Sequence, residues 1–234
     1  MIKHVALILD GNRRLAKELL KNPWEGHKMG IRTALNALQY AYEYGIKHVT
    51  AYVLSLENMK SRPAIELDFI MKYFKEECDS VLENKDHVIN KLGVKVNFIG
   101  RIKELNESLQ EKLDLIEKRT ANNKSMVLNV AIAYGGQQEI ADAVQKIALK
   151  VKDGSISPED LNEEVINNHL YTANQPSPDL IIRTGGERRL SNFLPYQSAY
   201  SELLFLDKRW PEMQRKDFIQ AFEEFENRKR RFGK

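Results

Sequence analysis

Short apolar runs alternate with longer segments of helical periodicity along most of this chain. In the longer segments apolar residues return every three or four positions, as in an amphipathic helix, whereas the short runs have the length of strands. This alternation predicts an α/β fold with a central, mostly parallel sheet flanked by helices. The predicted strands cover residues 4–9, 48–54, 94–99, 126–133, 179–183 and 202–205. The predicted helices cover residues 30–44, 65–82, 104–119, 137–152, 158–169 and 216–228.

The pattern predicts a single domain over residues 1–234. A chain of 234 residues with 42% hydrophobic residues can bury a sizeable core, and it contains neither an internal repeat nor a low-complexity linker. Residues 171–178 include two prolines and are predicted to form a loop.

Bulk charge and cysteine content limit the partners and the compartment that this chain fits. The formal net charge of +3 is too small to bind nucleic acid by itself, so no nucleic-acid partner is expected. Cys78 is the single cysteine, and no histidine stands at zinc-site spacing from it. No apolar run approaches the ~18 residues of a membrane span, and no signal-peptide pattern is present. The sequence therefore predicts a soluble, cytoplasmic protein.

Polar clusters follow four of the predicted strands. They are residues 10–14, 55–58 and 134–136, and the loop that begins at Arg183. Ligands of an open parallel sheet lie beyond the carboxyl ends of its strands. We therefore expect the four clusters to converge on one site.

The last of these clusters has the composition of a polyanion-binding loop. Arg183, Arg188 and Arg189 lie within seven residues, around Gly185 and Gly186. Guanidinium groups match phosphate oxygens with paired donors, and glycines let backbone amides approach the same anion. The loop is therefore predicted to bind a diphosphate.

Asp10 is a carboxylate at a strand end, followed by Gly11 and two arginines. This order suits Mg²⁺ beside a phosphate, because Mg²⁺ binds through one or two carboxylates together with substrate oxygens and water. A simpler interpretation is that Asp10 only caps the next helix while Gly11 makes the turn. The segment is neither a Walker A loop nor a dinucleotide fingerprint. Two separate basic loops indicate two phosphate-bearing ligands.

Eight parts of the chain, taken in order, carry a recognisable likeness: residues 9–14, 26–28, 55–58, 134–136, 183–193, 197–203 and 228–233, together with Asn129. With them the chain resembles the cis-prenyltransferases, the undecaprenyl diphosphate synthase family. The resemblance covers nearly the whole chain. It implies a homodimeric α/β enzyme with an apolar tunnel, in which isopentenyl diphosphate units are added to an allylic diphosphate with new double bonds in cis geometry.

The resemblance also implies roles for individual residues. Asp10 would bind Mg²⁺ and promote departure of the allylic diphosphate, with Glu202 as a second carboxylate. The residues implied for the allylic phosphates are Gly11, Asn12, Arg13, Arg14 and His27. Those implied for isopentenyl diphosphate are Arg183, Arg189 and Ser191. Further substrate contacts are expected from Leu15, Ser55, Leu56, Glu57, Met59, Arg62 and Leu190.

Asn58 matches the residue to which the family assigns proton removal after the carbon–carbon bond forms. A carboxamide is a poor base, so Asn58 is expected to orient the substrate or to relay a proton to diphosphate or water. Without the resemblance, residues 55–58 would be interpreted as an ordinary turn, and His27 as a helix cap or a surface residue.

Several positions of the chain depart from the family pattern. Leu15 and Met59 replace common aromatic residues, and Pro23 replaces an arginine, with Lys21 as the nearest basic residue. Another family arginine aligns with Ser61 or with Arg62, and the guanidinium favours Arg62. The basic tail 228–231 is interpreted either as a solvated helix end or, by the resemblance, as support for a dimer or a neighbouring active site.

One face of the predicted helix 65–82 is apolar. Its residues are Leu67, Ile70, Met71, Phe74, Cys78, Val81 and Leu82. Core packing explains such a face, but the resemblance implies that it lines a tunnel. Each added prenyl unit buries five carbons at ~0.8 kcal/mol per methylene, so a tunnel favours elongation until it is full.

The sequence thus predicts a Mg²⁺-dependent cis-prenyltransferase that makes a long polyprenyl diphosphate of the undecaprenyl class, a glycan carrier lipid precursor. Its apolar product implies peripheral contact with a membrane at release. The alternatives are a related prenyltransferase with a short product or an unusual acceptor, and a non-catalytic partner subunit of a prenyltransferase. A phosphate-binding regulatory module fits less well, because it needs no tunnel.

Overall fold

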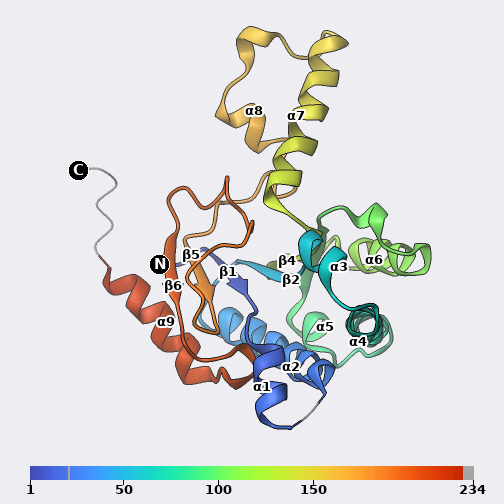
Figure 1. The fold of residues 1–234 in the computed structure, drawn as a ribbon. Helices are drawn as coiled ribbons and strands as arrows, with labels where there is room; N and C mark the ends of the chain where they lie inside the picture. The colour runs from blue at the N-terminus through green and yellow to red at the C-terminus, as the bar shows by residue number, and fades with distance from the viewer. Residues whose placement is uncertain (21, 229–234) are drawn as a thin grey trace.

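The computed structural model describes residues 1–20 and 22–228. Within these residues, six parallel strands form one sheet in the order β3-β4-β2-β1-β5-β6 (Figure 1). The strands are β1 His4–Ile8, β2 His48–Ser55, β3 Val94–Ile99, β4 Met126–Tyr134, β5 Leu180–Arg183 and β6 Glu202–Phe205. The predicted α/β fold with a parallel sheet is confirmed.

Helices connect the strands. They are α1 Asn12–Glu18, α2 Pro23–Glu43, α3 Leu56–Ser61, α4 Ala64–Glu83, α5 Val88–Leu92, α6 Glu107–Thr120, α7 Gly136–Lys152, α8 Glu163–Asn167 and α9 Arg215–Asn227. Single 3₁₀ turns add η1 Ile102–Glu104, η2 Pro158–Asp160 and η3 Trp210–Glu212. None of the helices in residues 1–20 and 22–228 combines the length and the apolarity that a membrane crossing needs.

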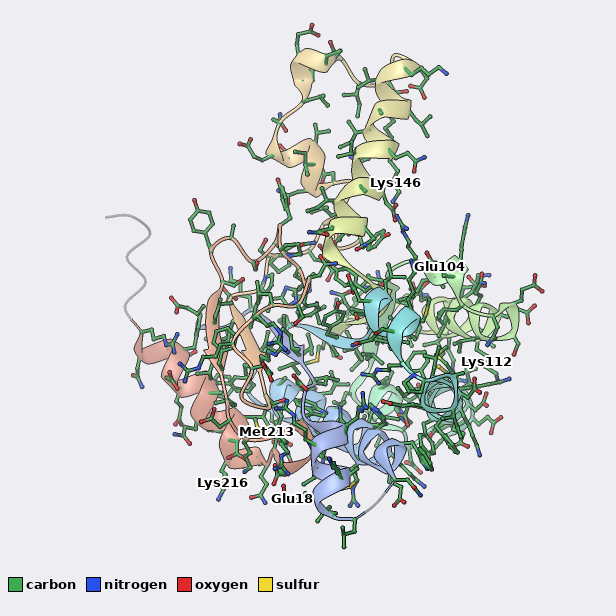
Figure 2. All side chains as sticks on the ribbon, viewed as in Figure 1. Glu18, Glu104, Lys112, Lys146, Met213 and Lys216 are labelled. Carbon is green, nitrogen blue, oxygen red and sulfur yellow. The ribbon has the colours of Figure 1, made fainter. Side chains whose placement is uncertain are left out.

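Both faces of the sheet are covered, and the two faces differ. Val5 and Leu7 of β1 belong to the main core, against α2, α4, α5, α6 and α9, whereas Ala6 and Ile8 belong to a second cluster with Phe193. Successive strand residues point to opposite faces, so burial on both sides explains why β1 reads as a continuous apolar run. Side chains occupy most of the space between the layers (Figure 2).

The two ends of the molecule in Figure 1 have different packing. At the top, α7 and α8 project away from the sheet. At the bottom, where Glu18 of α1 and Lys216 of α9 are labelled in Figure 2, Arg209 forms an ion pair with Glu18. This contact joins the first helix to the last part of the described chain.

The prediction of one helix over residues 158–169 is wrong. The chain forms η2 and then the short helix α8, whose N-cap is Asn162. The Asn162 side chain accepts a hydrogen bond from the Val165 amide at 3.0 Å, so it starts a new helix where the pattern predicted continuation. The helix predicted over residues 104–119 corresponds to α6, and its predicted start is early, because the Asn106 side chain caps α6 by accepting from the Leu109 amide.

Helix α2 begins seven residues before its predicted start, at Pro23 in the first turn. Gly26 lies in this added part, and a Cβ at Gly26 would collide with the carbonyl oxygen of Asn12 in α1. The apolar period is absent there because the helix contacts α1 through a glycine. The short helices α1, α3 and α5 were likewise not predicted.

Candidate active site

The polar clusters that follow β1, β2 and β5 lie around the mouth of one cavity, as predicted. The cavity has a volume of about 740 Å³, and residues from all three clusters line it. They are Asp10, Asn12, Arg13, Ser55, Glu57, Asn58, Arg183, Arg189, Ser191 and Asn192. The fourth cluster, after β4, meets the same loop, because the Gly136 amide donates to the Asn192 carbonyl at 2.8 Å.

Asp10 and Arg183 form an ion pair at the mouth. Strands β1 and β5 are parallel neighbours, and Ile8, the last residue of β1, lies opposite Arg183, the last residue of β5. Asp10, two residues after Ile8, therefore lies close to Arg183. Arg183 Nη2 donates to Asp10 Oδ2 at 2.9 Å, and Arg183 Nη1 donates to Ser191 Oγ at 2.7 Å. The Arg183 side chain is only 5% exposed, and that of Asp10 is 30% exposed. A buried guanidinium is thus held beside a carboxylate that solvent and ligands can reach.

The interpretation of Asp10 as a helix cap is wrong. The N-cap of α1 is Gly11, and no side chain caps this helix. Asp10 Oδ1 accepts instead from the Gly11 amide at 2.6 Å and from Arg14 Nη2 at 3.1 Å. Gly11 has φ of 105°, and a Cβ there would lie 2.6 Å from the Arg209 Cβ, so the turn requires glycine.

The double glycine acts differently from the prediction. The amides of Gly185 and Gly186 do not face the site, because they donate to the carbonyls of Lys208 at 2.8 Å and Leu206 at 2.9 Å. Gly185 instead makes room: a Cβ there would lie 2.6 Å from Arg14 Nη2. Gly185 therefore leaves the space in which Arg14 reaches Asp10, and the amides of the double glycine are not free to bind an anion.

A second basic cluster surrounds Glu66, which the sequence analysis missed. Glu66 lies in the first turn of α4 and is buried. Arg62 Nη1 and His27 Nε2 each lie 3.2 Å from its Oε1, and Arg13 Nε lies 3.5 Å from its Oε2. The spacing of Arg62 and Glu66, four residues apart across a helix start, was the signal that could have identified it.

The cluster determines the protonation of His27. Burial lowers the pKa of His27, and the neighbouring Arg62 lowers it further, although Glu66 opposes both effects. His27 is therefore a neutral hydrogen-bonding group at pH 7. Of the two residues considered for the family arginine position, Arg62 lines the cavity and Ser61 does not.

Residues 55–58 both cap a helix and line the site. Ser55 Oγ accepts from the Asn58 amide at 3.0 Å and caps α3. Glu57 Oε1 accepts from Asn192 Nδ2 at 2.8 Å, which ties this turn to the arginine loop. Ser55, Glu57 and Asn58 line the cavity. The interpretation of residues 55–58 as an ordinary turn is wrong, because they form the cap and the first turn of helix α3.

The structure does not place every predicted contact residue in the cavity wall. Gly11 and Arg14 adjoin Asp10 without lining the cavity. The apolar residues predicted to contact substrates pack elsewhere, in the core or against it. They are Leu15, Leu56, Met59 and Leu190.

Glu202 was predicted to provide a second metal-binding carboxylate beside Asp10. For two residues of the same chain this prediction is wrong. Glu202 is the first residue of β6 and pairs with Leu180, the first residue of β5, whereas Asp10 follows the end of β1. The two carboxylates are thus at opposite ends of the sheet, and Arg228 Nη1 donates to Glu202 Oε2 at 2.9 Å. Among the described residues no group of three or more His, Cys, Asp or Glu could hold a metal ion. Lys21 and residues 229–233, to which roles were also assigned, lie outside the described residues.

Below the charged mouth the cavity is apolar. Residues in or just after β1, and in β2 and β4, face it, and helices α2, α4 and α5 complete its wall together with η3. These residues are Leu7, Leu9, Val49, Ala51, Val53, Leu128 and Val130 from the sheet, and Ile31, Ala34, Leu35, Leu38, Ile70, Phe74 and Ile89 from the helices, with Trp210 in η3. Of the predicted tunnel face, only Ile70 and Phe74 line the cavity; the others belong to or pack against the core. Two polar members of α4 that were not predicted, Tyr73 and Glu77, line it as well.

Comparison with known proteins agrees with this geometry. The family model for putative undecaprenyl diphosphate synthases matches residues 8–233. A tritrans,polycis-undecaprenyl-diphosphate synthase (geranylgeranyl-diphosphate specific) of Methanocaldococcus jannaschii is 48% identical over 99% of this chain and 82% of its own length. An isoprenyl transferase of Thermus thermophilus is 43% identical over 100% of this chain and 89% of its own length.

Two crystal structures have the same fold along the whole chain. Lavandulyl diphosphate synthase from Lavandula x intermedia, in complex with dimethylallyl diphosphate, matches with a TM-score of 0.93 and 34% identity, over 100% of this chain and 98% of its own. A probable undecaprenyl diphosphate synthase from Campylobacter jejuni matches with a TM-score of 0.81 and 31% identity, over 100% and 99% of the two chains. The chain therefore belongs to the undecaprenyl diphosphate synthase family and is a cis-prenyltransferase, an enzyme of isoprenoid biosynthesis.

Proposed function

We propose that this chain is a Mg²⁺-dependent cis-prenyltransferase that elongates an allylic diphosphate with isopentenyl diphosphate to a polyprenyl diphosphate of the undecaprenyl class. The observation that supports the proposal most directly is that one cavity has both a charged mouth and an apolar interior. The Asp10–Arg183 pair and the His27–Arg62–Glu66 cluster stand at its mouth, and an apolar space of about 740 Å³ lies below them. Diphosphates need the first environment and prenyl chains need the second.

The residues at the mouth fit a magnesium ion that is completed by substrate. Mg²⁺ binds through one or two carboxylates, with substrate phosphates and water as its other ligands. Asp10 supplies one partly exposed carboxylate, and Arg13, Arg183 and Arg189 supply phosphate donors around it. When bound, the ion would stabilise charge on the departing diphosphate, which leaves an allylic cation.

The two basic groups are proposed to hold different diphosphates. Arg183, Arg189 and Ser191 hold isopentenyl diphosphate, and Arg13, His27 and Arg62 hold the allylic primer. Asn58, at the cavity wall between them, orients the substrate or relays the proton that leaves after bond formation. Because several relatives are named as geranylgeranyl-diphosphate specific, we propose geranylgeranyl diphosphate as the primer.

The proposal includes a homodimer in the cytoplasm, with peripheral membrane contact at product release. Exposed apolar side chains on the projecting α7, Val144 and Leu149, are the surface feature that supports a subunit contact. The buried Cys78 is compatible with a reducing compartment. The membrane contact follows from the apolarity of the proposed product.

The test is turnover with varied primers. Purified chain with Mg²⁺ and labelled isopentenyl diphosphate should incorporate label fastest with geranylgeranyl diphosphate, compared with farnesyl and geranyl diphosphate, and sizing should show long chains. Absence of incorporation with every primer would overturn the proposal. Incorporation that stops after one or two units would support a second candidate, a prenyltransferase with a short product. The likeness to lavandulyl diphosphate synthase is the observation that favours this second candidate.

A further inference from the structure

The far end of the apolar cavity is polar. Along α4, the residues that line the cavity are Ile70, Tyr73, Phe74 and Glu77, and Glu66, which pairs with Arg13, lies on the same helix face. At 1.5 Å per residue, Glu77 lies about 16 Å along the helix axis from Glu66. The sheet gives a similar depth, since the wall runs along β2 from Ser55 to Val49, about 20 Å. Glu77 is therefore at the end opposite the phosphate-binding groups.

His87 fixes the carboxylate of Glu77. The His87 side chain is buried, and its Nδ1 accepts a hydrogen bond from the Ile89 amide at 3.3 Å. Nε2 must then bear the proton, and it donates to Glu77 Oε1 at 2.7 Å. The Glu77 side chain is 26% exposed, so water can reach this carboxylate. We call Glu77 and His87 the polar floor.

The cavity is too small for a whole undecaprenyl chain. A cavity of about 150 Å³ holds one benzene molecule, so about 740 Å³ corresponds to roughly 30 carbon atoms. An undecaprenyl chain has nearly twice as many. Its first-made end must therefore reach the polar floor before elongation is complete.

We propose that the Glu77–His87 pair limits product length. Above the floor, every added prenyl unit leaves water for an apolar wall, which favours growth. At the floor, the advancing chain must remove water from a carboxylate without offering it a hydrogen bond, which opposes growth. Length is thus determined by a change in polarity at Glu77, in addition to the volume of the cavity. This inference rests on the proposed chain-elongating function.

The test compares product lengths of four variants with those of the wild type. Glu77→Leu removes the carboxylate, and Glu77→Gln keeps an acceptor for His87 but removes the charge. Glu76→Leu is the matched control, because Glu76 is one position along the same helix, 56% exposed, paired with Lys72 and outside the cavity wall. Leu35→Trp narrows the cavity above the floor and reports whether the chain occupies it.

Glu77→Leu should lengthen the main product by about one prenyl unit or more, and Glu77→Gln by less. Glu76→Leu should leave the length unchanged, and Leu35→Trp should shorten it. Unchanged length in Glu77→Leu overturns the inference, whether or not Leu35→Trp shortens the product. A longer product from Glu76→Leu would also overturn the inference, because the change in length would then not depend on the polar floor. A wild-type chain that makes no prenyl product would instead contradict the proposed function.

Discussion

At the scale of the residue, Arg183 shows why this site needs an arginine. Its two terminal nitrogens donate to Asp10, to Ser191 and to the Arg189 carbonyl, and no lysine can reach three acceptors in these directions. The same contacts fix the guanidinium in place before a substrate arrives. A group that is already oriented loses little entropy when a phosphate binds to it.

Arg183→Lys should therefore impair use of isopentenyl diphosphate while the charge is retained. Loss of the paired donors should lower kcat/KM for isopentenyl diphosphate by about 100-fold, with a smaller effect on KM for the primer. Steady-state kinetics with each substrate varied would measure both. Arg188→Lys is the control, since Arg188 is in the same loop but exposed and outside the cavity wall. Equal effects of the two substitutions would contradict the assignment.

His4 is a residue whose titration should be visible in stability. Its ring is buried, with Nδ1 donating to the Pro176 carbonyl at 2.7 Å and Nε2 accepting from Thr50 Oγ1 at 2.8 Å. Burial lowers the pKa of His4 to about 4. Between pH 6.5 and 4 the unfolded chain binds a proton at His4 that the folded chain does not bind, so stability falls as the pH falls.

The loss attributable to His4 should reach about 3 kcal/mol at pH 4, at ~1.4 kcal/mol per pH unit. Urea unfolding of the wild type and of His4→Gln at pH 7 and pH 4.5 would measure it. The variant should be less stable at pH 7, yet lose less stability on acidification. The same loss in both proteins would show that His4 is not the titrating group.

At the scale of the element, the contact between α1 and α2 positions the groups that are proposed to bind the allylic diphosphate. Asn12 and Arg13 begin α1, His27 lies in α2, and Gly26 allows the two helices to touch. The side chain of Asn12 also donates to the Leu9 carbonyl at 2.9 Å, which ties α1 to the end of β1. Small changes in this contact should therefore reach the site.

Gly26→Ala should separate α1 from α2. The new Cβ would collide with the Asn12 carbonyl, and such overpacking costs about 1–3 kcal/mol. Thermal unfolding should show a lower Tm, and KM for the primer should rise because Arg13 and His27 move apart. Glu25→Ala, a substitution of the adjacent residue in the same turn, is the control, and it should change Tm and KM for the primer much less. A wild-type Tm for Gly26→Ala would contradict the role given to this contact.

Most elements could be predicted because their buried residues either form a continuous apolar run, as in the strands, or recur every three or four positions, as in the helices. Strand β4 is buried along nearly its whole length and its limits differ from the prediction by one residue. Elements without such a period were missed or misjudged. Helix α3 depends on its Ser55 cap, the start of α2 on close approach at Gly26, and the break before α8 on the Asn162 cap. These are single local contacts, which an averaged pattern does not reveal.

At the scale of the whole molecule, the fold joins three strand ends at one cavity mouth. The polar clusters after β1, β2 and β5 were predictable because the carboxyl ends of parallel strands share one edge. The partners within the site were less predictable. Glu66 and the polar floor depend on how α4 lies against α2 and α5. Glu202 was misplaced because its role came from the resemblance alone, whereas the first residue of a parallel strand lies at the opposite end of the sheet from the site.

The central claim is that a diphosphate reacts at Asp10, above a cavity that receives the growing chain. Its most direct test is the incorporation of labelled isopentenyl diphosphate into chloroform-soluble product by wild type, Asp10→Ala and Asp86→Ala, with and without EDTA. Asp86 is an exposed surface carboxylate and serves as the control. The account predicts full activity for wild type and Asp86→Ala, at least about a 100-fold loss for Asp10→Ala, and loss of all activity with EDTA. Wild-type activity in Asp10→Ala, or activity that persists without metal, would contradict it.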